Sequence, residues 1–394
     1  MKKRVLIVMD CILPVPASKG GAVSTLIESL AKVNEKEKKC QLHVFTIKDS
    51  KSIEFEAKYP HTVFIPFRNK DWIDKLDSIF FKKKSIIKKL LVIRQVRKYL
   101  KDNSFDCIIL ENFGYLLKIF RNRSLLEEYT GKIYYHLHND IPYNVDVSIV
   151  GQCNLLLVSR FLEKRIEEVC GNEVLKRCKV VKNGIDVSKF KQQLSDVEKE
   201  ELKCKLKIAD NEKTIVFVGR LDETKGISVL MSALQKIDMT SLKLVVVGAT
   251  LFGKKEVSPY EEKIKRLCEK LGDKVIFTGF IHNSEVWKYY KIADVVVLPS
   301  IWDEPAGLTM VETSVSGVPL ITTNSGGIPE YIKKASAIML PKEDDLAIKL
   351  AEAIESIFEN IEVEKKKAES FVEFYAESFS EETFYHNFIN SLDL

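Results

Sequence analysis

The chain has 394 residues, more than one ordinary hydrophobic core supports, so two domains are expected. Its hydrophobic content of 45% and charged content of 30% are those of a soluble globular protein, and no run approaches the roughly 18 apolar residues of a membrane-spanning helix. The 61 basic and 56 acidic residues nearly balance. No aromatic platform or groove-reading motif accompanies the basic residues, so nucleic acid is not an expected partner.

The start of the chain and its cysteines favour a cytoplasmic protein. The apolar run over residues 5–9 stops at Asp10, which is too short for a signal-peptide core, so we expect no secretory leader. The eight cysteines are scattered from Cys11 to Cys268 with no close pair. They fit free thiols in a reducing compartment better than a disulfide framework or a zinc site.

Short β-branched runs alternate with helical patterns through the first half of the chain. Residues 5–9 predict a strand, Gly20-Gly21 a turn, and residues 23–33 a helix. Further strands are predicted over residues 42–47, 107–110, 132–136, 155–158 and 179–181. The first domain is expected to cover residues 1–180.

A basic amphipathic helix is predicted over residues 82–101. No acidic residue lies between Asp77 and Asp102, and nine basic residues do. Its apolar residues recur at helical spacing, at Ile86, Leu90, Ile93, Val96 and Leu100. Two interpretations stay open: contact with an anionic membrane surface, or a domain helix with a solvated polar face.

The same alternation restarts after a charged, helix-prone stretch over residues 195–206. Strands are predicted over residues 214–218, 244–247, 275–277, 295–298 and 320–322. The restart predicts an α/β protein with two parallel sheets, each covered on both faces by helices. The second domain is expected over residues 181–372, and the aromatic segment 373–394 is expected to form a helix against the first domain. Ligands in such folds bind at the carboxyl ends of strands, so we expect the sheets to face each other across a cleft.

Residues 299–312 carry the most specific pattern in the chain. Glu304 and Glu312 lie eight positions apart, and Gly307 opens the helix that holds the second acid. Carboxylates accept hydroxyl groups and the first amides of a helix donate to phosphate, as a nucleotide-sugar site requires. A helix N-cap could explain Glu304 by itself. It explains Glu312 poorly, because that acid lies in a helix of small residues that is expected to pack.

Arg220 directly follows a predicted strand, and Lys225 lies five positions further on. Arginine offers a planar fork to two phosphate oxygens and lysine a point charge, so the pair could neutralise one diphosphate without a metal. The alternative is a pair of surface cations.

His136 and His138 alternate onto one face at the end of a predicted strand. Either could be a structural histidine. Together with Asp140 they could suggest a metal, but no third ligand motif and no Asp-x-Asp pattern accompany them, so we expect no metal site. The Gly20-Gly21 loop is not the dinucleotide-binding fingerprint, although paired glycines allow close approach to a phosphate or sugar.

Together these residues resemble the retaining glycosyltransferases of family 4, which have the GT-B fold of two Rossmann-like domains. The resemblance covers nearly the whole chain in the expected order. Its motifs are Gly20-Gly21, His138, Asn183-Gly184, Gly219-Arg220, Lys225-Gly226, Gly279-Phe280, Pro299-Ser300, Glu304 to Glu312 and Gly326-Gly327. The chain also looks similar to bacterial members involved in surface polysaccharide or spore-coat sugars.

The resemblance implies donor-binding roles in the second domain. Glu304 would hold the hydroxyls of the donor sugar and Glu312 those of the ribose, while Arg220 and Lys225 would neutralise the diphosphate. Backbone contacts to phosphate and to the base are implied at Gly307, Leu308 and Thr309, and at Phe280 and Ile281.

In the first domain the resemblance places His138 beside the anomeric centre, as a catalytic residue together with Glu304. Gly21 would approach the donor phosphate or the acceptor. Ala306 departs from the family, where many relatives have phenylalanine, so the resemblance does not predict the sugar.

The predicted activity is that of a retaining, metal-independent glycosyltransferase without a cofactor. It would move a sugar from a nucleoside diphosphate, UDP, to a hydroxyl of a glycan or lipid-linked acceptor in cell-surface polysaccharide or glycoconjugate synthesis. It would lie in the cytoplasm or at the inner face of the plasma membrane. The alternatives are a GT-B sugar-nucleotide epimerase, a non-catalytic nucleotide-sugar binding subunit, and a phosphorylase with a pyridoxal cofactor.

Overall fold

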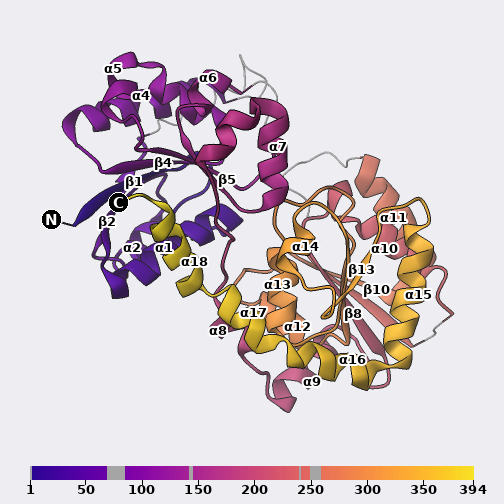
Figure 1. Ribbon diagram of the computed structural model, residues 1–394. Helices are drawn as coiled ribbons and strands as arrows, with labels where there is room; N and C mark the ends of the chain where they lie inside the picture. Colours follow the sequence, from indigo (N-terminus) through magenta and orange to yellow (C-terminus); the bar gives the residue numbers. More distant parts are fainter. Residues whose placement is uncertain (1, 69–84, 142–144, 239–240, 249–258) are drawn as a thin grey trace. The chain divides into compact units, whose positions relative to one another are not determined.

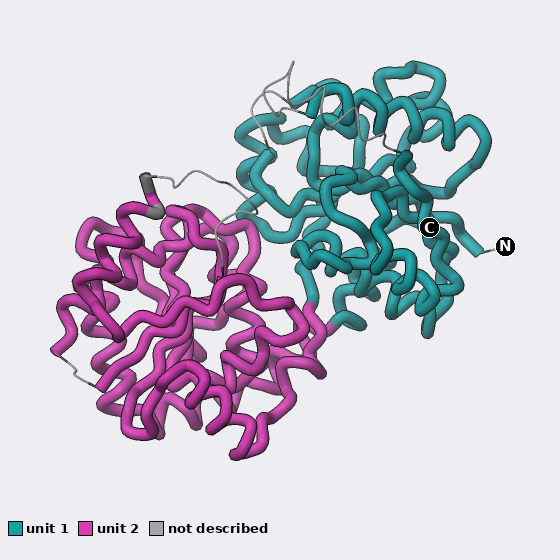
Figure 2. Tube along the Cα trace, turned by 180° about the vertical axis from the view of Figure 1, so that it is seen from behind, with its two compact units in different colours: residues 1–184, 381–394 teal, residues 185–380 magenta. Residues whose placement is uncertain are grey.

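The structure is a computed structural model that describes residues 2–68, 85–141, 145–238, 241–248 and 259–394. The chain divides into two compact units (Figure 2). The first contains Met1–Gly184 and Glu381–Leu394, and the second contains Ile185–Ser380. Each unit is built on one parallel sheet with helices on both faces (Figure 1).

The first unit has a seven-stranded sheet in the order β3-β2-β1-β4-β5-β6-β7. Its strands are β1 (Lys3–Val8), β2 (Cys40–Thr46), β3 (Thr62–Pro66), β4 (Cys107–Glu111), β5 (Ile133–Leu137), β6 (Asn154–Leu157) and β7 (Cys178–Val180). All pairs are parallel. The chain builds outward from β1 to one edge and then returns to β4 on the other side of β1. The strand order therefore reverses between β1 and β4, where α/β sheets bind ligands.

Helices of the first unit cover both faces of this sheet (Figure 1). They are α1 (Ala22–Glu37), α2 (Ser50–Glu56), α4 (Ile86–Asp102), α5 (Arg123–Glu128), α6 (Val147–Val150), α7 (Arg160–Cys170) and α18 (Glu381–Ser391), with 3-10 turns at Gly114–Arg121 and Asn172–Arg177. In Figure 1, α4, α5 and α6 lie on one side of the sheet, and α1, α2 and α18 on the other.

The basic segment forms α4, whose apolar stripe packs inward. Val92, Ile93, Val96 and Leu100 are buried, so α4 is a domain helix of the first unit. Arg97 donates from Nε to the Ile119 carbonyl at 2.8 Å. Other residues of the stripe stay outside, with Ile86 and Leu90 exposed by 37% and 59%. Lys82, Lys83 and Lys84 lie outside the described residues. No described helix is long and apolar enough to cross a membrane.

The second unit has a six-stranded parallel sheet in the order β10-β9-β8-β11-β12-β13. Its strands are β8 (Lys213–Val218), β9 (Leu242–Val247), β10 (Val275–Gly279), β11 (Val295–Leu298), β12 (Leu320–Thr323) and β13 (Ile338–Leu340). Val216, Val245, Val296 and Ile321 in its centre are fully buried. The strand order reverses between β8 and β11, which repeats the plan of the first unit.

Helices also cover both faces of the second sheet (Figure 1). They are α8 (Val187–Lys191), α9 (Asp196–Lys205), α10 (Ile227–Leu234), α11 (Pro259–Leu271), α12 (Val286–Lys291), α13 (Leu308–Val315), α14 (Ile328–Tyr331), α15 (Leu346–Glu359), α16 (Ile361–Ser370) and α17 (Val372–Ser378), with 3-10 turns η3 (Glu223–Lys225) and η4 (Gly272–Lys274).

The aromatic C-terminal segment divides between the units at residue 380, whereas the sequence placed the boundary at 372. The reason is Tyr375 of α17, which is fully buried in the second unit and accepts a 2.8 Å hydrogen bond from the Lys333 amide. In the first unit, Glu381 of α18 accepts hydrogen bonds from Ser29 and Lys32 of α1, each at 2.5 Å. The segment that returns to the first unit is therefore α18.

Candidate active site

The predicted donor-site residues of the second unit lie at the carboxyl edge of its sheet. Arg220 follows β8, Phe280 follows β10 and Glu304 follows β11. Because the strands are parallel, these loops emerge at the same edge. The Arg220 and Glu304 loops follow the two neighbouring strands between which the strand order reverses.

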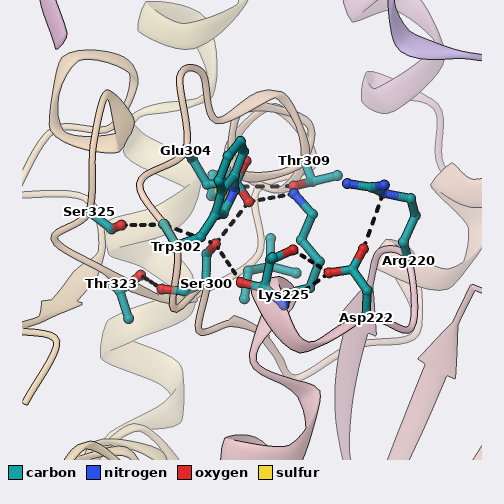
Figure 3. A network of polar contacts seen from close by, with 12 residues as sticks. Arg220, Asp222, Lys225, Ser300, Trp302, Glu304, Thr309, Thr323 and Ser325 are labelled. Carbon is teal, nitrogen blue, oxygen red and sulfur yellow. Dashed lines mark hydrogen bonds and ion pairs between the residues drawn. The ribbon is translucent and has the colours of Figure 1, made fainter. Parts of the chain in front are cut away.

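Lys225 and Glu304 form an ion pair through Nζ and Oε1 (Figure 3). The Ser300 hydroxyl lies 2.9 Å from the same carboxylate oxygen. The loop that carries Ser300 contacts the loop that carries Lys225, because the Ile301 amide donates to the Thr224 carbonyl at 2.9 Å. Glu304 is only 8% exposed. A buried carboxylate needs such partners, and the cation meets this need.

Arg220 is the more open of the two cations. Its side chain is 55% exposed, and its Nε lies 3.5 Å from Asp222 Oδ2. In Figure 3 the Arg220 guanidinium and the Lys225 amine both point toward Thr309, in the first turn of α13. The first amides of a helix have no acceptor within the helix and carry partial positive charge. Two cations and a helix N-terminus therefore meet at one place in this unit.

Glu312 lies one turn further along α13, beside a tyrosine of α12. The Tyr290 hydroxyl donates to Glu312 Oε2 at 2.9 Å. Burial raises the pKa of Glu312 to about 7, although Tyr290 and the charge of Lys189 act in the opposite direction. This carboxyl group therefore changes charge near neutral pH.

Two glycines allow the loops of this site to approach one another. Gly226 has φ +73°, and a Cβ there would overlap the carbonyl oxygen of Pro299. Gly326 has φ +55°, and a Cβ there would meet the backbone of Glu304. The next amide, of Gly327, donates to the Glu304 carbonyl at 2.6 Å. The Gly326-Gly327 turn thus packs against the loop that carries Glu304 and hydrogen-bonds to it.

Phe280 and Ile281 follow Gly279, which ends β10 with φ +71°. The Gly248 amide donates to the Gly279 carbonyl at 3.2 Å, so the ends of β9 and β10 are joined. Phe280 is 58% exposed, while Ile281 packs against the core. The structure places this segment at the same sheet edge as Arg220.

In the first unit, Gly21 precedes α1 with φ +101°, and a Cβ there would overlap the Leu13 side chain. His138 follows β5, and its side chain is 6% exposed. Its Nε2 lies 2.9 Å from Oε2 of Glu111, and His136 Nδ1 lies 3.2 Å from Oε1 of the same acid. Asp140 does not join this group but pairs with Arg165 at 3.2 Å.

Sequence reasoning missed Glu111 as the partner of both histidines. The available signal was an acid directly after the apolar run of residues 107–110, at the carboxyl end of a strand. The expectation that no third potential ligand accompanies the histidines was wrong. Glu111, His136 and His138 bring donor atoms within 4.8 Å of one another. Ligand atoms of tetrahedral zinc lie about 3.3–3.6 Å apart when the bonds are about 2.0–2.2 Å long, farther than Glu111 lies from either ring nitrogen. The observed distances to Glu111 are those of hydrogen bonds.

Solved structures share the fold over the whole chain. HepE of Anabaena in complex with UDP has a TM-score of 0.75 at 19% identity, covering 100% of this chain and 99% of that one. WaaG, a glycosyltransferase involved in lipopolysaccharide biosynthesis, has a TM-score of 0.68 at 16% identity, covering 96% and 98%. Two parallel α/β domains with these neighbours define the GT-B class, which confirms the predicted fold.

Sequence comparisons point to the same class of protein and define a domain in the second unit. Residues 198–374 match the model described as Glycosyl transferases group 1. An uncharacterised glycosyltransferase of Methanocaldococcus jannaschii is 36% identical over 192 residues, which span 48% of this chain but only 46% of that protein. Spore coat protein SA of Bacillus subtilis is 24% identical over 332 residues, or 82% of this chain and 81% of that protein. Residues 198–374, most of the second unit, therefore form a group 1 glycosyltransferase domain.

Proposed function

We propose that the chain is a retaining, metal-independent glycosyltransferase that uses a UDP-sugar. The observation that carries this proposal is the grouping of Arg220, Lys225 and Glu304 at the N-terminus of α13, within one unit. Cations and helix amides suit a diphosphate, and the neighbouring carboxylate suits sugar hydroxyls. The HepE structure with UDP supports the choice of nucleotide.

Donor binding would exchange the partners of Lys225. The diphosphate would take the place of Glu304 as the counterion of Lys225, with Arg220 and the amides of Leu308 and Thr309 beside it. Glu304 would then accept hydroxyl groups of the sugar, because its Oε1 would lose its cation. Glu312 would hold the ribose, and Phe280-Ile281 would meet the base.

The transfer step would need no protein nucleophile. The bond between the anomeric carbon and the diphosphate oxygen breaks while the acceptor oxygen bonds on the same face. The departing phosphate takes the proton of the acceptor hydroxyl. The protein positions the reactants and stabilises the charge that develops on the leaving group. His138 would lie beside the anomeric centre.

The acceptor is proposed to be a glycan or lipid-linked sugar of the cell surface. Relatives that support this class include the lipopolysaccharide 1,2-N-acetylglucosaminetransferase of Salmonella typhimurium, 25% identical over 247 residues. The alpha-monoglucosyldiacylglycerol synthase of Streptococcus pneumoniae is 30% identical over 214 residues. We also propose a cytoplasmic location, with peripheral contact to anionic membrane through residues 82–101.

Substitution of the two paired residues tests the donor site. Lys225→Ala and Glu304→Ala should each lower transfer from UDP-sugar by at least about 100-fold, since each removes charge stabilisation or sugar contacts at the reacting centre. The measurement is initial transfer rate with chelator present. Lys236→Ala and Glu352→Ala, at exposed positions of the same unit, serve as controls.

Near-normal transfer by both site variants would contradict the proposal. Complete loss of activity in chelator, restored by a divalent cation, would contradict metal independence. Release of an epimerised free sugar from UDP-sugar without acceptor would favour the epimerase instead. UDP binding without any transfer would favour the binding subunit.

A further inference from the structure

Two polar residues, Glu111 and Asn112, lie where the strand order of the first sheet reverses. The proposed donor site of the second unit does not include them. Glu111 ends β4, and Asn112 follows it with φ +61°. The pair lies where the strand order turns between β1 and β4, the position that binds ligands in such sheets. In parallel register Glu111 lies opposite His136 of β5.

Glu111 fixes the two histidine rings through its two oxygens. It is 1% exposed, and it accepts from His138 Nε2 at 2.9 Å and from His136 Nδ1 at 3.2 Å. Burial raises the pKa of Glu111, but the two histidines more than offset it and hold the pKa at about 2. Because an ionised carboxylate only accepts, each facing ring nitrogen must carry a hydrogen. His138 is thereby fixed as the Nε2–H tautomer, with Nδ1 as its remaining acceptor.

Asn112 fixes the backbone of the same segment. Its Oδ1 accepts from the amides of His138 at 3.1 Å and Asn139 at 3.0 Å. Its own amide donates to the His136 carbonyl at 2.7 Å. Asparagine tolerates the left-handed conformation better than most residues. Side chain and main chain of residues 136–139 are thus held from two consecutive positions.

The far side of the histidine pair is closed by α18. The ring of Phe388 lies 5.5 Å from that of His136, and the two histidine rings lie 4.1 Å apart. Among the described residues, His138 Nδ1 and His136 Nε2 have no hydrogen-bond partner, although both atoms are buried. Such buried acceptors are costly in a purely structural site.

We propose that Glu111 and Asn112 are positioning residues of the transferase, which hold the His138 segment in place and set the tautomer of its ring. This inference rests on the proposed function. It adds a reason for the carboxyl end of β4 to be polar, and it leaves Nδ1 as the acceptor atom of the His138 ring. Metal ligation by the same three side chains is the competing interpretation, and it would require Glu111 to give up its hydrogen bonds to both rings.

The test uses variants that remove one contact at a time from the full chain. Glu111→Gln replaces one accepting oxygen by an amide that donates, which favours an unprotonated nitrogen on the ring that this amide faces. Its kcat should fall about 100-fold, the order expected for a misplaced reacting group, while its KM for UDP-sugar stays within about twofold of the parent value. Long-range ¹⁵N NMR of the histidine rings should show the altered tautomer. Glu127→Gln, an exposed glutamate of the same unit, is the control.

Asn112 provides a second route should Glu111→Gln fail to fold. Asn112→Gly keeps the left-handed backbone and its amide, and removes only the side-chain acceptor. It should lower kcat at least tenfold without loss of UDP binding. Asn112→Asp keeps an acceptor at the same position and should recover most of that loss.

The outcomes separate this inference from the proposed function. Parental kcat in both Glu111→Gln and Asn112→Gly, with His138→Ala and Lys225→Ala inactive, would overturn the inference and leave the proposed function intact. Unchanged activity in Lys225→Ala and Glu304→Ala would overturn both. One equivalent of zinc retained by purified protein through chelator treatment would also overturn the inference, because Glu111 would then be a metal ligand.

Discussion

At the scale of residues, the proposed donor site of the second unit contains two acids with different partners. Glu304 has Lys225 as its cation, whereas Glu312 accepts a hydrogen bond from the Tyr290 hydroxyl and is influenced by the charge of Lys189. The two acids were predicted from one spacing, yet their surroundings differ. Protonation of Glu312 therefore affects both stability and binding.

The raised pKa of Glu312 predicts that ionisation of this acid lowers the free energy of unfolding but favours UDP binding. Its pKa is raised to about 7 in the fold, mainly by burial. The folded form thus binds the proton more readily than the unfolded form, and the free energy of unfolding falls as pH rises from about 4.5 to 7. Glu312→Gln should raise the unfolding temperature more at pH 8 than at pH 5. It should also weaken UDP binding at pH 8, where the ionised acid accepts from ribose.

Thermal unfolding at both pH values, with and without UDP, measures this effect. Glu352→Gln, an exposed glutamate of α15, is the control. An equal change in unfolding temperature at pH 5 and pH 8 would contradict the assigned cause.

The contact of Gly226 with Pro299 predicts a loss of both stability and donor affinity. Gly226→Ala introduces a positive-φ strain of about 1–2 kcal/mol and a clash with a carbonyl oxygen. The total loss in the free energy of unfolding should exceed about 3 kcal/mol, with weaker UDP binding. Gly272→Ala is a matched control, because Gly272 has φ +61° and open space around it. Denaturant unfolding and UDP titration of both variants provide the measurement, and equal losses would contradict the prediction.

At the scale of elements, α4 combines a buried stripe with an exposed apolar edge. Its buried residues pack α4 into the first unit. Ile86 and Leu90 remain exposed, so packing within the unit does not account for their apolar side chains. Lysines lie between them at positions 88 and 89. This combination is typical of helices that rest on anionic lipid.

Vesicle binding tests the proposed contact of α4 with anionic membrane. The protein should co-sediment with vesicles that contain anionic phospholipid, and Leu90→Glu should reduce the bound fraction severalfold, because it places a negative charge at the proposed contact. Ile53→Glu is the matched control, since Ile53 of α2 is 58% exposed in the same unit. Equal recovery with neutral and anionic vesicles would remove the proposal.

At the scale of the whole molecule, periodicity predicted every described strand except one edge strand in each sheet. Thr62–Pro66 and Ile338–Leu340 escaped prediction because each is a short edge strand, and β13 is buried only in part along its length. The grouping of Arg220, Lys225 and Glu304 at one sheet edge could be predicted, because these residues follow neighbouring strands at short spacings. The pairing of Glu111 with His136 and His138 could not be, since it depends on which strands become neighbours.

The return of α18 to the first unit has a consequence for how the protein is made. Glu381 and Tyr385 supply partners for Ser29 and Asn34, some 350 residues earlier in the chain. During synthesis, the surface of α1 that contacts α18 therefore stays uncovered until the second unit has been synthesised. The N-terminal half can collapse early, but only the last helix completes it.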